Sequence, residues 1–368
     1  MANIVHAPLG QHVDLDSQIN QTPDSDTCWR QILNVLWARQ LTIHNVSTRR
    51  AELNCYFQYY ATQGRQALED GGREIVYRSH REFLEIVQMI VTGKTRQEIY
   101  QHVEQRVPSP RPNNADALVD NAIDLAARLL LMIQVGDPSH YILNRCEEIL
   151  WEQGTIKDFL SLNFKTQTVL AIDQTKLDIL FNARNLDRIA GLKIEWTFNL
   201  ADHLLLRDSE HDPDAIIHIF HCASFLQNIE TRNRQIFPNN FIDETLRTLA
   251  LLMPPNNKDV IQWFKKQRSS QGLLDVTAVQ LPLLKIKDRR IENFTFWRDR
   301  LVILKQRFDD ADPSSFRQWR HDKRKKVQFY TFWVAIVTLV LTALLALIQD
   351  VEAALQVYKA YKPTSPRI

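Results

Sequence analysis

The chain has 368 residues, which is enough for one large domain or two medium domains with an apolar core. Hydrophobic residues make up 45% of the chain and charged residues 24%, a balance that excludes a largely disordered protein. The formal net charge of +2 excludes strong polyelectrolyte behaviour of the whole molecule, and we expect no nucleic acid partner.

The first 24 residues are polar and lack apolar periodicity, so residues 1–24 are predicted to form a disordered arm. They have neither a basic n-region nor an apolar h-region, and we therefore expect no signal peptide. No CxxC pair occurs in the chain. The cysteines are predicted to be reduced thiols of a cytosolic protein. They are Cys28, Cys55, Cys146 and Cys222.

Residues 25–315 are predicted to form an α-helical cytosolic region, so the expected fold class is mainly α. The chain has only 9 glycines, where average usage of about 7% would give roughly 25, and this scarcity favours helices joined by short connections. The clearest helix covers residues 113–137, between Pro112 and Gly136, where apolar residues recur at intervals of three and four. A break near residues 136–155 could divide the region into two subdomains.

The tetrapeptide TGKT at residues 92–95 invites comparison with a nucleotide-binding loop, but the full pattern is missing. A phosphate loop needs a second glycine five residues before Gly93, and Gln88 stands there. We predict instead that one helix stops at Gly93 and that Thr95 caps the next helix.

Two apolar stretches around the acidic turn SEHDPD could form a small β-hairpin near residues 203–221. With the helix expected before it, this hairpin could also be a fragment of a winged helix. The same region holds the densest group of potential metal ligands. A zinc site usually needs four ligands at defined spacing, so we interpret these side chains as structural and assign no metal ligand. The group consists of His203, His211, His218, His221 and Cys222.

Amphipathic helices are predicted at residues 241–253, 259–267 and 290–308. The chain contains no nucleophile elbow, no zinc-protease motif, no dinucleotide fingerprint and no EF-hand loop. We therefore predict no catalytic residue and no cofactor, and we interpret the protein as a non-enzyme.

A basic segment at residues 316–326 precedes the most apolar part of the chain. It carries six basic residues against the single acid Asp322. By the positive-inside rule this end of the span is expected to stay in the cytosol, against the anionic cytosolic leaflet. The residues predicted to determine topology are Lys323, Arg324, Lys325 and Lys326.

Residues 329–348 contain no charged side chain. At ~1.5 Å per residue, twenty residues span ~30 Å, the thickness of the hydrocarbon core of a bilayer. We therefore predict a transmembrane helix over residues 327–349, and prefer it to a buried core helix because the run is apolar on every face. Residues 350–368 would be a short extracytoplasmic tail, which makes the protein single-pass and tail-anchored. The predicted membrane anchors are Phe329, Trp333, Leu341 and Ile348.

Several blocks of the C-terminal half carry a resemblance to a known family. They are FNARNLDRIAGLKIEWTFNLADHLLL, IFHCASFL, IDETLRTLALL and the long block from IENFTFWRDRLVILKQRF to VEAALQVYKAY. Through these blocks the chain resembles a family of uncharacterised proteins common in filamentous ascomycete fungi, over most of residues 80–360. The resemblance implies a helical cytosolic part and a C-terminal membrane span. It implies no activity and no site residues.

These features predict a tail-anchored protein that recruits or organises a protein partner at an intracellular or plasma membrane, without catalysis. The first alternative is a membrane-acting effector whose span oligomerises in signalling or cell death. Thr338 and Thr342 lie four residues apart, and Ala343 and Ala346 three apart, so small residues form no strong packing motif and a plain anchor is favoured. An enzyme of unrecognised type is the second alternative.

Overall fold

Helices dominate the computed structural model, and the mainly α class predicted from the sequence is confirmed. The chain divides into two compact units, Met1–Ala311 and Asp312–Ile368. The predicted break near residues 136–155 does not separate two units, since both of its sides belong to the first. The structure describes residues 13–23, 25–69, 75–136, 149–166, 176–209, 212–229, 231–311 and 326–361.

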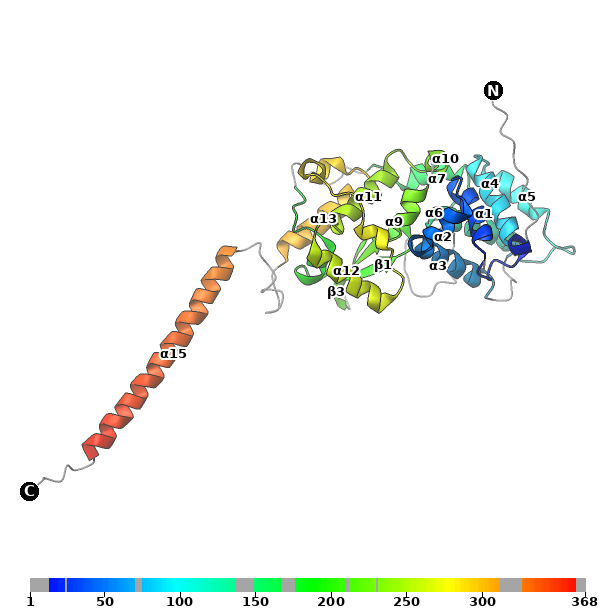
Figure 1. The fold of residues 1–368 in the computed structure, drawn as a ribbon. Helices are drawn as coiled ribbons and strands as arrows, with labels where there is room; N and C mark the ends of the chain where they lie inside the picture. Colours follow the sequence, from blue (N-terminus) through cyan, green and yellow to red (C-terminus); the bar gives the residue numbers. More distant parts are fainter. Residues whose placement is uncertain are drawn as a thin grey trace, which may run out of the picture. The chain divides into compact units, whose positions relative to one another are not determined.

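The N-terminal part of the first unit is built from helices, which gather at one end of that unit (Figure 1). The helix α6 contacts α3, α4, α5 and α1, and it is buried on most of its surface. These elements are η1 (Val13–Asp16), α1 (Asp26–Trp37), α2 (Ile43–Thr48), α3 (Arg50–Ala67), α4 (His80–Val91), α5 (Arg96–Glu104), α6 (Ala115–Leu131) and α7 (Ile156–Asn163).

The end of α6 differs from the prediction. The helix stops at Leu131, where Met132 adopts a left-handed conformation with φ of 51°, rather than continuing to Gly136. Gly136 has a φ of 92°, and a Cβ there would clash with Asp124 Oδ2. Glycine is therefore required at this position by backbone conformation and by close contact, not as the stop of the helix.

Local capping signals place the starts of three helices. Ser79, Thr95 and Thr155 each accept a backbone hydrogen bond inside a complete capping box. The predicted cap at Thr95 is thus confirmed, and Gly93 before it has a φ of 82°, as the end of a helix demands. The TGKT tetrapeptide is a turn between two helices.

Residues 13–23 are not the disordered segment predicted for residues 1–24. Leu15 and Ile19 are fully buried, and the Ile19 N–H donates to Arg78 O at 2.7 Å. Two apolar side chains spaced four apart supply the burial, a signal too short to stand out in a polar stretch. Residues 1–12 of the predicted arm lie outside the described part of the chain.

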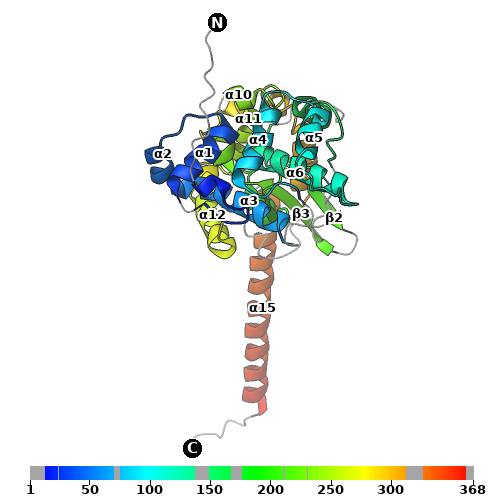
Figure 2. The same cartoon turned by 90° about the vertical axis from the view of Figure 1, so that its right-hand side faces the viewer.

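A three-stranded sheet with the order β1-β3-β2 lies toward the other end of the unit (Figure 1). Its elements are α8 (Ala183–Arg188), β1 (Lys193–Thr197), η3 (Leu200–Asp202), β2 (Leu206–Ser209) and β3 (Asp212–Phe220). The strands β2 and β3 lie side by side (Figure 2) and pair antiparallel, with Leu206 opposite Ile217, so the predicted hairpin is confirmed. The strand β1 was not predicted. It pairs parallel with β3, with Lys193 opposite Ile216, and this mixed sheet replaces the winged-helix alternative.

The remaining described elements of the first unit follow β3 in the sequence, and most of them contribute side chains to the hydrophobic core. They are α9 (Ala223–Asn228), α10 (Thr231–Arg234), α11 (Phe241–Leu252), α12 (Lys258–Gln271), η4 (Val276–Val279), η5 (Ile286–Arg289), η6 (Ile291–Asn293) and α13 (Arg298–Asp310). The described part of the second unit is one unbroken helix, α15 (Lys326–Tyr361), visible in Figures 1 and 2.

Candidate functional site

The helix α15 is long and apolar enough to cross a membrane. Its candidate span, Trp333–Tyr361, has a mean hydropathy of 2.3 in its most apolar window, and none of that window is buried. A core helix of a soluble protein of the same composition would be mostly buried. The span was predicted to end at residue 349, but the helix continues to Tyr361.

The predicted anchors fall on this helix. Trp333, Leu341 and Ile348 are exposed side chains of α15. Phe329 lies near the start of the helix, and its side chain is outside the described part. Of the predicted topology determinants, Lys326 begins α15, and residues 323–325 lie outside the described residues.

A second candidate site lies inside the first unit, where Cys55 of α3 and Cys222 form a disulfide across 167 residues of sequence. Their Cα atoms are 6.1 Å apart, a normal separation for such a bond. The prediction of four reduced thiols is therefore wrong for this pair. Cys28 is a buried free thiol, and Cys146 lies outside the described residues.

The side chain of His221 faces this disulfide. Its Nδ1 lies 3.6 Å from Cys55 Sγ and 4.0 Å from Cys222 Sγ, and it accepts a hydrogen bond of 3.5 Å from the Asp275 N–H. The ring also packs edge-on against Trp196 of β1 and against Phe198, which follows β1. The accepted N–H makes Nδ1 the unprotonated nitrogen.

Burial lowers the pKa of His221 to about 3, so its imidazole is neutral near pH 7. Neutral imidazole nitrogen and cysteine sulfur are ligands for thiophilic metal ions. The donor atoms of Cys55, His221 and Cys222 all lie within 4.8 Å of one another, so with the disulfide reduced these three could hold a metal ion. They supply three ligands, one fewer than structural zinc sites use.

His203 is held inside the core by hydrogen bonds to both ring nitrogens. Thr248 Oγ1 donates to Thr245 O, so it accepts from His203 Nε2 at 2.7 Å. The N–H of Phe220 donates to His203 Nδ1 at 3.3 Å. Both ring nitrogens are thus satisfied inside the core, and burial followed by the charge of Arg300 lowers the pKa of His203 to about 3.

His218 is not brought into this cluster. His218 Nδ1 lies 3.7 Å from Glu195 Oε2 across the parallel strands, and burial, then the charge of Arg207, lowers its pKa. His211 lies outside the described residues. The sequence places Cys222 among potential metal ligands with the nearby histidines. It gives no sign of Cys55, because no local pattern joins residues so far apart.

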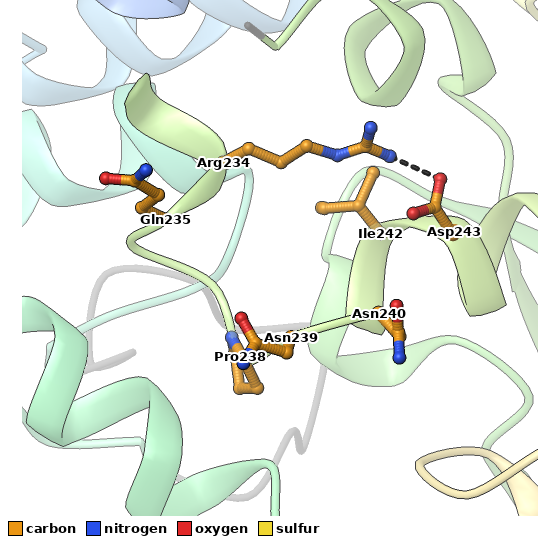
Figure 3. A pocket seen from close by; sticks show the side chains of 7 residues that line it. All are labelled: Arg234, Gln235, Pro238, Asn239, Asn240, Ile242 and Asp243. Atoms are coloured by element: carbon orange, nitrogen blue, oxygen red, sulfur yellow. Dashed lines mark hydrogen bonds and ion pairs between the residues drawn. The ribbon is translucent and has the colours of Figure 1, made fainter. Parts of the chain in front are cut away.

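A pocket of about 160 Å³ lies at the turn between α10 and α11 (Figure 3). Arg234 reaches across it to Asp243, with 2.5 Å between Nη2 and Oδ1. Ligand pockets usually have volumes of roughly 300–1,000 Å³, so this hollow is small for a substrate. The remaining lining residues are Gln235, Pro238, Asn239, Asn240 and Ile242.

Comparison with known proteins gives no match: no family model, no curated protein and no solved structure is significantly similar to the chain. The helix α15 and the buried cysteine pair are therefore the features of the chain that bear on its function.

Proposed function

We propose that the protein is tail-anchored by α15 and that its first unit is a non-enzymatic module that recruits a protein partner to the membrane. The observation that carries this proposal is the 36-residue apolar helix, none of whose most apolar window is buried. A free helix of this composition in water would expose a large apolar surface, which soluble proteins avoid. The resemblance to a family of filamentous ascomycete proteins, which itself remains a proposal, supports the same architecture.

The proposed orientation places the first unit in the cytosol. Six basic residues precede the span, and three follow it, namely Lys359, Lys362 and Arg367. Such an excess favours retention of the preceding side in the cytosol. The segment 316–326 would then lie against anionic lipid of the cytosolic leaflet.

The disulfide favours the opposite orientation as a second candidate. Disulfides persist mainly in oxidising compartments and are rare in the cytosol. If the first unit is cytosolic, Cys55 and Cys222 should be recovered as thiols from cells lysed in an alkylating reagent. If it faces a lumen or the cell exterior, the bond between them should survive.

Deleting residues 327–368 tests the anchor. The shortened chain should be a soluble, folded protein, because the first unit has its own core. The full chain should stay in the membrane pellet after extraction with alkaline carbonate, whereas the shortened chain should appear in the supernatant. A shortened chain that still sediments with membranes after a high-salt wash would show that α15 is not the sole anchor.

A further inference from the structure

The proposed anchor leaves part of α15 unexplained. Its 36 residues measure about 54 Å at ~1.5 Å per residue, against about 30 Å of hydrocarbon core. If the charge-free run up to Ile348 crosses the membrane, the last 13 residues, 349–361, form an unbroken helix on the far side. There Val351, Leu355 and Tyr358 are exposed.

We propose that α15 pairs in parallel with α15 of a second copy of this chain, an inference that rests on the proposed anchoring. The contact would follow one seam, which we call the α15 seam. Its members alternate at spacings of three and four, the heptad pattern of two-stranded coiled coils. They are Val334, Val337, Leu341, Leu344, Ile348, Val351, Leu355 and Tyr358, all exposed.

The polar side chains leave this seam clear. In the far-side part, Gln349, Glu352, Gln356 and Lys359 follow one another at spacings of three, four and three, and so share a separate face. Asp350 also lies off the seam. Beyond the charge-free run, one side of the helix is therefore polar and can face water. Another side is apolar and can pack against a second apolar surface.

The polar face is a poorer contact than the seam. Within the span, Thr338 Oγ1 donates to Val334 O at 2.8 Å and Thr342 Oγ1 to Thr338 O at 2.7 Å, so neither hydroxyl needs an acceptor on another helix. In a parallel pair joined along this face, Glu352 would meet the Glu352 of the second copy, and like charges would oppose association.

A second copy explains the far-side residues better than lipid does. Val351, Leu355 and Tyr358 are interleaved with the charged residues Asp350, Glu352 and Lys359. Burying the three apolar side chains in hydrocarbon would carry those charges into it, which is unfavourable. Identical copies anchored the same way present the same seam at the same height. Pairing therefore needs no change of register between helices.

Site-specific photocrosslinking in the full chain tests the pairing. A benzophenone amino acid replaces Leu355 or Tyr358 on the seam, and Ala353 or Ala360 on the opposite side serves as the matched control. Two differently tagged copies are expressed together, and membranes are irradiated. The expected result is a product carrying both tags, several-fold stronger from the two seam positions than from the two alanines.

A second pair of variants checks that the seam itself makes the contact. With the probe at Tyr358, Leu355→Glu should remove the doubly tagged product, and Ala353→Glu should leave it. Equal yields at all four probe positions, or no doubly tagged product from alkali-resistant membranes, would overturn the pairing. Loss of the chain from the membrane pellet would instead refute the anchor, and a seam-specific product in the soluble fraction would still support pairing.

Discussion

Glu244 shows how one buried side chain joins two distant parts of the first unit. It is 1% exposed, and its carboxylate accepts the N–H groups of Thr295, Phe296 and Trp297 at 2.8–2.9 Å. These donors belong to the three residues immediately before α13, which begins at Arg298. A carboxylate from α11 thus holds the segment that leads into α13.

Replacing Glu244 by Gln should lower the free energy of unfolding by roughly 2–3 kcal/mol, since an amide brings a donor to a place that supplies only donors. The neighbouring Asp243→Asn variant is the matched control. Asp243 forms an exposed ion pair with Arg234, and its loss should cost less than about 1 kcal/mol. Urea unfolding of the soluble chain ending before residue 327 measures both. Equal losses in the two variants would contradict the role of Glu244 in holding the segment before α13.

The buried histidines predict a pH dependence of stability. The pKa values of His203 and His221 are lowered to about 3 in the folded chain by burial, against about 6.5 when unfolded. Between pH 6.5 and 3 the unfolded chain therefore binds protons that the folded chain does not. Stability is complete above pH 6.5 and falls as the pH drops, by about 1.4 kcal/mol per pH unit for each histidine.

The variant His203→Gln should show a smaller slope of unfolding free energy against pH, whatever its stability at pH 7. Chemical unfolding at several pH values between 4 and 7.5 provides the slopes. An unchanged slope in His203→Gln would refute the assigned burial effect.

The sequence predicts residues that interact with neighbours a few positions away. It does not predict residues whose partners lie in distant segments of the chain. The cap at Thr95 depends on Glu98 three residues away, so its pattern is visible in the chain itself. The link between Cys55 and Cys222 and the contacts of Glu244 join segments separated by tens to more than a hundred residues. No periodicity records such pairs.

At the scale of elements, periodicity identified α6, α11, α12 and the β2–β3 hairpin but not β1. The helix predicted from residue 290 begins only at Arg298, because residues 291–293 form the short 3-10 helix η6. A hairpin can be predicted from sequence because its two strands and the turn between them are adjacent in the chain. The strand β1 pairs with β3 only after residues 198–211, a connection that includes β2, and its burial alternates only weakly. The end of α6 was misplaced for a related reason, since Gly136 is required by contact with Asp124.

The basic segment before α15 should bind anionic membranes. Each Lys or Arg near such a surface contributes about 1 kcal/mol, and salt screens the attraction. A peptide of residues 316–326 should therefore lose most of its binding to phosphatidylserine vesicles when Lys323, Arg324, Lys325 and Lys326 become Gln. Binding to neutral vesicles is the control. Equal binding of both peptides to anionic vesicles would refute an electrostatic role for the segment.

At the scale of the whole molecule, one compact unit and one long apolar helix account for the chain's two parts. The helical character of the first unit and the apolar character of α15 could be predicted, because both depend on amino-acid composition and on the spacing of apolar residues. The side of the membrane cannot be read in the same way, since the basic segment and the disulfide favour opposite orientations. Asn45-Val-Ser47 and Asn293-Phe-Thr295 match the glycosylation acceptor pattern, and both asparagines are exposed.

The glycosylation state of these sites is the most direct test of a cytosolic unit held by a C-terminal span. We predict no glycan on Asn45 or Asn293, and a glycan on an acceptor placed in a polar extension after Pro363, because glycosylation occurs in the lumen. The measurement is a gel shift that collapses on enzymatic deglycosylation. A shift in the unmodified protein that disappears when Asn45 and Asn293 become Gln would contradict the account and place the first unit outside the cytosol.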